Sequence, residues 1–203
     1  MSYETLSQIA ENRRSIRKFS DKPVLRSDIE KIIQIGMMAP SGFNAQPWEI
    51  VVVDDKQLQG KITDLLLEGL GKTSRGFISA PVYLIMYADE RVRKYGPAAK
   101  IDNDAWWEFT LNTSLSCAFM NMQLATSSLG LGSMWVSAFR NPNVDQPTRD
   151  LLNIPKHLRV YEMLAIGHPD MDPGKKKLRN ISDVVHFNRA DNYRSVDELE
   201  EWF

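Results

Sequence analysis

The chain has 203 residues, of which 43% are hydrophobic and 25% are charged, as is usual for a globular protein with one core. Its formal net charge of −1 gives no reason to expect nucleic acid or an anionic membrane as a partner. The single cysteine excludes an intrachain disulfide framework, and neither a secretory signal nor a run of about 20 apolar residues is present, so we expect a cytoplasmic protein.

Five segments have the apolar spacing of helices, namely residues 3–13, 27–38, 54–70, 106–129 and 146–152. Ser2 and Ser27 are the predicted N-caps of the first two, with Glu30 three residues after Ser27 as in a capping box. The 106–129 helix carries no charge from Phe109 onward. We therefore expect it to be a buried central helix or a helix that contacts another subunit.

Four short apolar runs predict strands, at residues 48–53, 81–87, 133–136 and 159–166. Helices interleaved with strands indicate an α+β or α/β fold. No linker divides the chain, so residues 1–203 are predicted to form one domain. Residues 90–105 are irregular and charged, which suggests a lid or an excursion, and the tail from Pro169 is polar, basic and loosely structured.

Several familiar sites are not expected. Gly69 to Ser74 resembles only the end of a phosphate-binding loop and follows a helix, and Gly130 to Ser133 lacks the third glycine of a dinucleotide fingerprint. The three histidines are not at metal-ligand spacing, so no metal site is predicted. Cys117 lies among apolar residues of a helix, which favours buried packing over a nucleophilic role.

Three polar clusters remain, and each alone is typical of a solvated surface. They are the positive run Arg13, Arg14, Ser15, Arg17 and Lys18; the uncharged loop Pro40, Ser41, Gly42, Phe43, Asn44 and Gln46; and the basic run Lys175 to Arg179. Together they could bind a phosphate through guanidinium and ammonium groups, and the edge of a planar heterocycle through amides and hydroxyls. A phosphate joined to a flat polar ring is a mononucleotide-like cofactor.

Four stretches in order, "RRSIRKF", "APSGFNAQPW", "LGLGSMWVSAF" and "DVVHFNR", resemble motifs of the nitroreductase family of flavoproteins and span residues 13–189. The resemblance implies an α+β fold with a central, mostly antiparallel sheet flanked by helices. It also implies a homodimer with FMN sites at the subunit interface. Reducing equivalents would pass from NADH or NADPH to a nitroaromatic, quinone or similar acceptor by a ping-pong mechanism. No side chain need act as an acid or base, so no catalytic residue is predicted.

The resemblance also implies roles for individual residues. Arg13, Arg14, Ser15 and Arg17 would hold the phosphate, ribityl chain and pyrimidine edge of FMN. Pro40, Ser41, Gly42, Phe43, Asn44 and Gln46 would reach the flavin of the partner subunit. Trp135, Val136, Ser137 and Ala138 would run along the ring, with the Ser137 backbone N–H facing N5. Lys176 and Arg179, with Lys177 as an alternative, would contact the phosphate, and Arg75 would be a further basic contact.

Ser137 and Ala138 stand where family members often have an acidic residue and glycine, which leaves the substrate preference open. Trp106, Trp107 and Phe43 could wall the open face of the flavin, although packing in the central helix or the dimer is the favoured role. Other functions also remain open: a flavin-binding or sequestering protein with little turnover, a family enzyme for dehalogenation, enone reduction or flavin destruction, or a phosphate binder without flavin.

Overall fold

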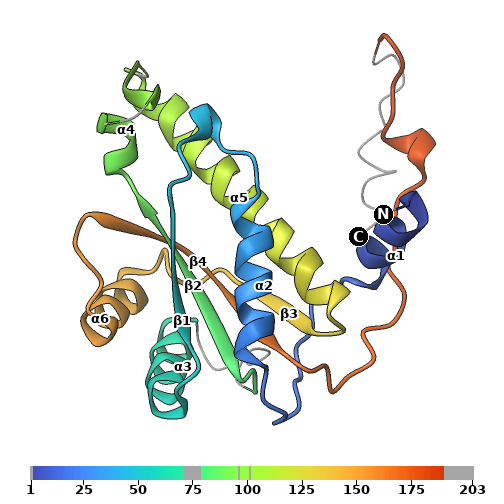
Figure 1. Cartoon of the computed structure of the whole chain (residues 1–203), viewed down its shortest axis with the longest axis horizontal. Coiled ribbons are helices and arrows are strands. Elements are labelled where there is room, and N and C mark those ends of the chain that lie inside the picture. Colours follow the sequence, from blue (N-terminus) through green and yellow to red (C-terminus); the bar gives the residue numbers. More distant parts are fainter. Residues whose placement is uncertain (1, 71–78, 96, 101, 190–203) are drawn as a thin grey trace. The chain divides into compact units, whose positions relative to one another are not determined.

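The computed structural model describes residues 2–70, 79–95, 97–100 and 102–189. The chain forms two compact units, Met1–Pro173 and Gly174–Phe203, and each is described by itself. In chain order the helices of the first unit are α1 (Tyr3–Asn12), α2 (Arg26–Met37), η1 (Gly42–Asn44), α3 (Lys56–Leu70), α4 (Arg91–Tyr95), η2 (Pro97–Lys100), α5 (Asp104–Ser128) and α6 (Pro142–Leu152). Its strands are β1 (Trp48–Val53), β2 (Val82–Asp89), β3 (Gly132–Val136) and β4 (Leu158–Gly167) (Figure 1).

The helix starts follow local capping chemistry. The Ser2 side chain accepts a hydrogen bond from the Thr5 backbone N–H, which confirms the predicted cap of α1. The cap predicted for α2 is wrong: α2 begins at Arg26, and Leu25 occupies the N-cap position without a side-chain hydrogen bond. Ser27 therefore lies inside the first turn, where it cannot cap. Helix α6 begins at Pro142, earlier than predicted, because Asn141 caps it and proline suits the first helical position.

The four strands form one antiparallel sheet in the order β1-β2-β4-β3, which confirms the predicted mostly antiparallel sheet. Strand β2 is buried along almost its whole length, as its uninterrupted apolar sequence predicts. Strand β3 lies at one edge, where it pairs with β4 from Gly132↔Gly167 to Val136↔Met163. The edge position of β3 matters for the site, because its other side is open to a further segment of chain.

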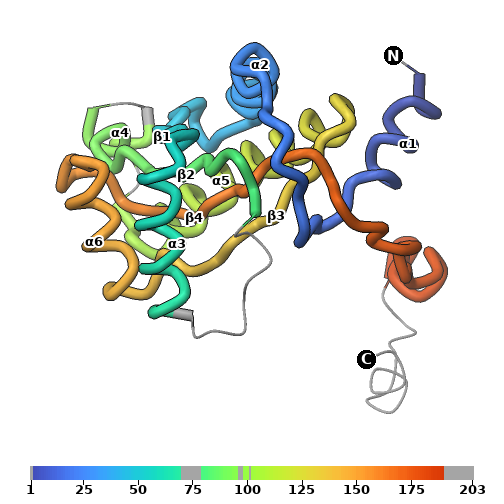
Figure 2. The backbone as a smooth tube through the Cα atoms, turned by 90° about the horizontal axis from the view of Figure 1, so that it is seen from below, coloured from blue at the N-terminus to red at the C-terminus, as the bar shows by residue number. Residues whose placement is uncertain are grey.

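Helices cover both faces of the sheet. Figure 2 shows α2 and α5 on one side and α3 and α6 on the other. One core cluster joins α2 and α5 to residues such as Leu84, Met86 and Leu164, and the other joins α3 and α6 to residues such as Tyr83, Ile85 and Met163. Successive residues of a strand therefore pack into opposite cores, because their side chains alternate between the two faces of the sheet.

Residues 90–105, predicted to be a lid or excursion, contain the short helices α4 and η2 within their described part. Arg93 pairs with Asp104 at 2.6 Å, which ties α4 to the start of α5. A role as a lid stays a prediction. The second unit contains the 3-10 helix η3 (Ile181–Asp183) in its described part.

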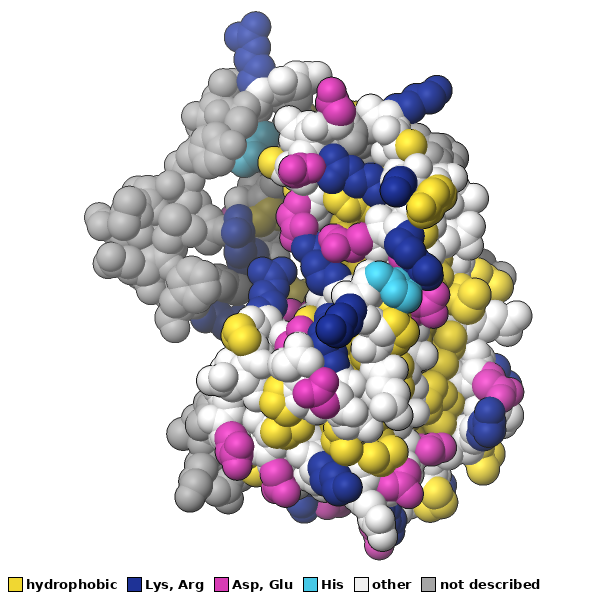
Figure 3. All heavy atoms as spheres, turned by 90° about the vertical axis from the view of Figure 1, so that its left-hand side faces the viewer, with side chains coloured by type: hydrophobic (Ala, Val, Ile, Leu, Met, Phe, Trp, Pro, Cys, Tyr) yellow, Lys and Arg dark blue, Asp and Glu magenta, His cyan; other side chains and the backbone are white. Residues whose placement is uncertain are grey.

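Figure 3 shows Lys and Arg interspersed with Asp and Glu over the face that it presents, rather than one sign gathered in a single patch. Ion pairs of this chain include Arg91–Asp89 and Arg159–Glu90. Among the residues that the structure describes, no helix has both the length and the apolar character needed to cross a bilayer.

Candidate functional site

The positive run near the N-terminus, residues 13–17, leaves α1 and lies along the edge strand β3. We call it the arginine segment. The Ile16 backbone N–H donates to the Ser133 carbonyl at 2.9 Å, and Ser15 bridges Ser133 in parallel. Ile16 is buried, whereas Ser15 and Arg17 are exposed. A Cβ atom on Gly132 would lie 2.6 Å from Ile16 Cγ1, so this glycine permits the close approach. The segment is thus fixed with its polar side chains outward.

The guanidinium groups of the arginine segment contact neutral partners. Arg13 Nη1 donates to Gln123 Oε1 on α5 at 3.4 Å, and Arg17 Nη1 donates to the Ser15 carbonyl at 3.3 Å. Arg14 donates to the Arg13 carbonyl at 3.1 Å. Within the described part of the chain, neither Arg13 nor Arg17 has a carboxylate partner. Their charges are therefore available to an anion, and this set of donors fits a phosphate group.

The uncharged loop, residues 40–47, is anchored to α5. The Gly42 backbone N–H donates to Ser114 Oγ at 3.0 Å, and the Gln46 backbone N–H donates to Ser41 Oγ at 3.0 Å. A Cβ on Gly42 would lie 2.1 Å from Thr110 Cγ2, so only glycine fits there without a shift. The contact of Gly42 with α5 and the internal bond from Gln46 to Ser41 leave Phe43 and Asn44 on the surface.

Three non-glycine residues of the uncharged loop have left-handed backbone angles: Phe43 at φ 58°, Asn44 at φ 53° and Gln46 at φ 46°. Such angles cost energy in residues other than glycine and gather at functional sites. All three side chains are exposed. The loop therefore presents an amide-rich surface in one strained conformation, which fits a ligand or a partner better than a plain connection.

The uncharged loop and the arginine segment lie toward opposite ends of α5 (Figure 1). Their contacts on α5, Ser114 and Gln123, are nine residues apart, or about 14 Å along a helix. The small pocket beside Arg13, Gln123 and Ser133 holds about 50 Å³, little more than the volume of one water molecule. One chain therefore does not enclose a mononucleotide between these two groups of residues.

The third group of predicted residues follows directly along β3. Trp135 packs edge-to-face against Phe119 at 4.8 Å between ring centroids, and Val136 is buried. Ser137 is exposed, and Ala138 after it is buried. Ser133 of β3 contacts the arginine segment, and Ser137 directly follows β3, four residues or about 13 Å further along the strand direction. We call residues 135–138 the strand-end segment.

The predicted residues of the basic tail lie in the second unit. The Arg179 Nη2 group donates to the Asp183 carbonyl at 3.0 Å, and Lys176 is half-buried. Their approach to a phosphate at the arginine segment stays a prediction, as does the choice between Lys176 and Lys177. Arg75 lies outside the described residues.

The aromatic residues predicted as possible walls of the flavin site differ in burial. Trp107 is 4% exposed and belongs to the core, whereas Trp106 is 53% exposed and meets Phe43 edge-to-face at 6.1 Å. The prediction that Cys117 is buried is wrong: it is exposed on the outward face of α5. The lack of charge in this stretch misled that prediction, because α5 is uncharged on its exposed face as well as on its buried face from Phe109 onward.

Sequence reasoning missed one buried acid, Glu162. It lies in β4, and burial raises its pKa to about 7, while Arg140 and the Ser137 hydroxyl act in the opposite direction. A signal was present, because Glu162 is the one carboxylate in the apolar run "VYEMLAIG". In the described part of the chain, no cluster of three or more His, Cys, Asp or Glu side chains is placed to hold a metal.

The family model described as "Nitroreductase family" matches residues 10–168, and the chain belongs to the nitroreductase family. An FMN reductase [NAD(P)H] of Bacillus subtilis is 32% identical over 93% of this chain and 74% of its own. An iodotyrosine deiodinase of Thermotoga neapolitana is 28% identical over 90% of this chain and 97% of its own.

Solved structures share the fold as well. The crystal structure of nitroreductase A from Vibrio parahaemolyticus superposes with a TM-score of 0.80 and 25% sequence identity. The match covers 99% of this chain and 82% of that one. The sheet and its flanking helices are therefore those of a nitroreductase-like fold.

Proposed function

We propose that this protein is an FMN-dependent oxidoreductase that transfers reducing equivalents from NADH or NADPH to a nitroaromatic, quinone or similar acceptor. The observation that carries the proposal is the arginine segment. It sets Arg13 and Arg17, without carboxylate partners in the described chain, along the same edge strand that leads to Ser137. The FMN reductase relative and the family membership support the same chemistry.

The residues present fit FMN. Arg13 and Arg17, with Arg14 and Ser15, would hold its phosphate and polar edge through charge-assisted hydrogen bonds. The strand-end segment would hold its ring, in part through the Ser137 backbone N–H. When bound, FMN supplies the redox chemistry, accepting a hydride from NAD(P)H and passing electrons to the acceptor. The positive charges of Arg13 and Arg17 would favour the negative charge that reduction adds.

We further propose that the active form is a homodimer joined through the outward face of α5. From Phe109 to Ser128 this helix has no charged residue, yet Phe109 is 67% exposed and Met120 is 42% exposed. An uncharged helix face of this length that exposes large apolar side chains is typically covered by a partner. A second copy would also bring its uncharged loop, residues 40–47, to an arginine segment that one chain leaves about 14 Å away along α5.

The visible spectrum of the purified protein is the first test. We expect a yellow protein whose released cofactor is FMN, whose absorbance bleaches anaerobically with NADH or NADPH, and whose colour returns with a quinone or nitroaromatic acceptor. Parallel lines in initial-rate plots would identify ping-pong kinetics. A bound flavin that is reduced by dithionite but not by NADH or NADPH would identify a flavin-binding protein. A colourless protein that does not bind added FMN would contradict the proposal.

The position of the phosphate has a separate test. Changing both Arg13 and Arg17 to Ala should weaken FMN retention by at least about 100-fold, because each charged hydrogen bond contributes about 1.5–3 kcal/mol. Arg26→Ala with Lys31→Ala is the matched control, since it removes two surface cations of α2. Undiminished FMN binding in the first variant would show that the phosphate lies elsewhere.

A second candidate, reductive dehalogenation, is favoured by the iodotyrosine deiodinase relative, which this chain matches over 97% of that protein's length. It would use the same FMN site. Release of iodide from iodotyrosine by the reduced protein, at a rate above its reduction of quinones and nitroaromatics, would select this function. Absence of iodide release would leave the first proposal as the preferred one.

A further inference from the structure

The buried acid Glu162 owes its position to an irregularity in the sheet. Strand β2 pairs Ile85 with Met163 and Tyr87 with Val160, so two residues of β4, Tyr161 and Glu162, stand opposite a single residue of β2. This is a β-bulge, a feature that redirects side chains and recurs beside active sites. The Glu162 side chain is only 7% exposed as a result.

The carboxyl of Glu162 is incompletely paired. Arg140 Nε lies 3.9 Å from Oε1, and the Arg140 side chain itself is largely exposed. Val136 pairs with Met163, so Ser137 follows opposite Glu162, and its hydroxyl stabilises the ionised carboxyl. Oε2 is buried and has no partner among the residues that the structure describes. A buried carboxylate with one distant cation is costly, which is why the pKa rises to about 7.

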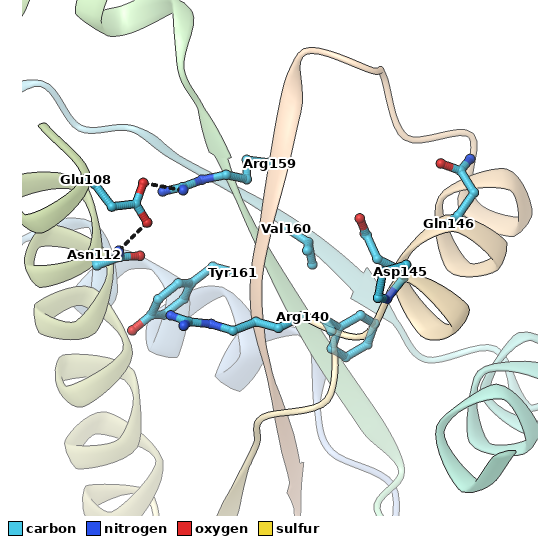
Figure 4. A pocket seen from close by; sticks show the side chains of 10 residues that line it. Glu108, Asn112, Arg140, Asp145, Gln146, Arg159, Val160 and Tyr161 are labelled. Carbon is cyan, nitrogen blue, oxygen red and sulfur yellow. Dashed lines mark hydrogen bonds and ion pairs between the residues drawn. The ribbon is translucent and has the colours of Figure 1, made fainter. Parts of the chain in front are cut away.

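A pocket of about 390 Å³ is lined by two neighbours of this acid, Arg140 and Tyr161, although Glu162 itself does not line it. Figure 4 shows the Arg140 side chain extended across β4 toward Tyr161 and α5. The other charged groups that line the pocket are Glu108 on α5, Arg159 on β4 and Asp145 on α6. Burial, and then the charge of Glu162, raise the pKa of Tyr161, so its phenol stays protonated. The pocket adjoins Glu162 through Arg140, which lines it and lies 3.9 Å from Oε1.

Ser137 links this acid to the proposed flavin site. It is the exposed residue of the strand-end segment, and it stands opposite Glu162 where the β3–β4 register continues past Val136 and Met163. We propose that Glu162 is a proton-exchanging positioning residue of the flavin site: it binds one proton from solvent when negative charge is added beside Ser137, and it passes its protonation state to that segment through the Ser137 hydroxyl. This inference rests on the proposed function, which sets the reducible ring along residues 135–138.

The coupling follows from electrostatics and linkage. Negative charge added nearby makes a second negative charge at Glu162 less favourable, so the carboxylate takes up a proton and forms an O–H bond. Linkage is reciprocal, so the protonated carboxyl must in turn favour reduction. Arg140 opposes proton uptake, because its positive charge stabilises the ionised carboxyl.

The test is the midpoint potential of bound FMN, measured over about two pH units on either side of neutrality. In the wild type we expect the slope of potential against pH to change near pH 7. Glu162→Gln, which keeps the size of the side chain, should bind FMN and lose that change of slope. Identical profiles in the wild type and Glu162→Gln would overturn the inference.

Two further variants test the same inference if Glu162→Gln folds poorly. Arg140→Gln and Ser137→Ala each remove a group that stabilises the ionised carboxyl, so both should move the change of slope to higher pH. Arg159→Gln is the matched control, because it removes an arginine of the same pocket that pairs with Glu90 and Glu108. A change of slope that stays in place in Arg140→Gln and Ser137→Ala would also contradict the inference.

Infrared spectroscopy separates this inference from the function on which it rests. The C=O band of a protonated carboxyl should titrate near pH 7 in flavin-free protein and be lost in Glu162→Gln. If that band is present but the protein never binds FMN, the proposed function fails and the coupling fails with it. If FMN binds and its midpoint potential varies with pH in the same way in the wild type and in Glu162→Gln, only the coupling fails.

Discussion

Glu162 carries its carboxyl in strand β4, where burial raises its pKa from 4.5 to about 7. At the residue scale this shift makes stability depend on pH. Below the unfolded value of 4.5, both states hold the proton and nothing changes with pH. Between 4.5 and about 7 the folded state binds more protons than the unfolded state, so stability falls as pH rises. Above about 7 the loss is complete, at up to about 3 kcal/mol.

Glu162→Gln should remove this dependence. Relative to the wild type, the variant should gain up to about 3 kcal/mol of unfolding free energy between about pH 5 and about pH 8. Urea unfolding at the two pH values measures the gain. Glu30→Gln on the exposed face of α2 is the control and should show no comparable gain. An equal difference from the wild type at both pH values would mean that Glu162 does not titrate in this range.

At the scale of the element, strand β2 holds two buried tyrosines that differ in one respect. The Tyr83 hydroxyl bonds Thr63 Oγ1 at 2.9 Å, across to α3. The Tyr87 hydroxyl is buried without a hydrogen-bond partner in the described part of the chain, although Arg149 lies over its ring at 5.6 Å. The two tyrosines therefore allow a buried hydroxyl that makes a hydrogen bond to be compared with one that makes none, on the same strand.

Tyr83→Phe should destabilise the protein by about 1–2 kcal/mol, because it breaks a buried bond and leaves Thr63 without that partner. Tyr87→Phe should be neutral or stabilising by up to about 1 kcal/mol. It removes a buried hydroxyl that makes no hydrogen bond to compensate for its loss of water, and it keeps the ring under Arg149. Thermal or urea unfolding of both variants gives the comparison. A larger loss for Tyr87→Phe than for Tyr83→Phe would reveal a partner for the Tyr87 hydroxyl.

At the scale of the whole molecule, the proposed homodimer makes the single cysteine a probe. Cys117 is exposed in one chain and lies on the outward face of α5 with Met120. In a dimer formed through this face its thiol should react slowly with a bulky reagent. Met120→Glu would place a charge in the interface, so it should give a monomer with faster labelling and weaker FMN retention.

Light scattering after size exclusion measures the mass, and a thiol-reactive dye measures the labelling rate. Leu25→Glu is the matched control, because it adds the same charge at an exposed apolar residue outside α5. A wild-type monomer that retains FMN would contradict the dimer and leave the uncharged loop without its proposed role.

The sequence by itself determined the elements and the family. Strands β1 to β4 lie close to the predicted runs, and Ser2 caps α1, because apolar periodicity and capping act between near neighbours in the chain. The arginine segment and the strand-end segment were predicted as site residues from their motifs, and the structure places the first beside β3 and the second at its end. Local patterns failed at the start of α2, where the choice of cap was marginal, and at Cys117, where uncharged sequence did not distinguish the buried face of α5 from the exposed one.

Only the tertiary structure decided how distant segments meet. The order β1-β2-β4-β3, the separation of the uncharged loop from the arginine segment and the exposure of Cys117 all depend on which face each element turns toward the sheet. The burial of Glu162 depends on one extra residue in the pairing of β4 with β2. No local pattern encodes such a bulge, because its energy comes from contacts between strands that are more than 70 residues apart in the sequence.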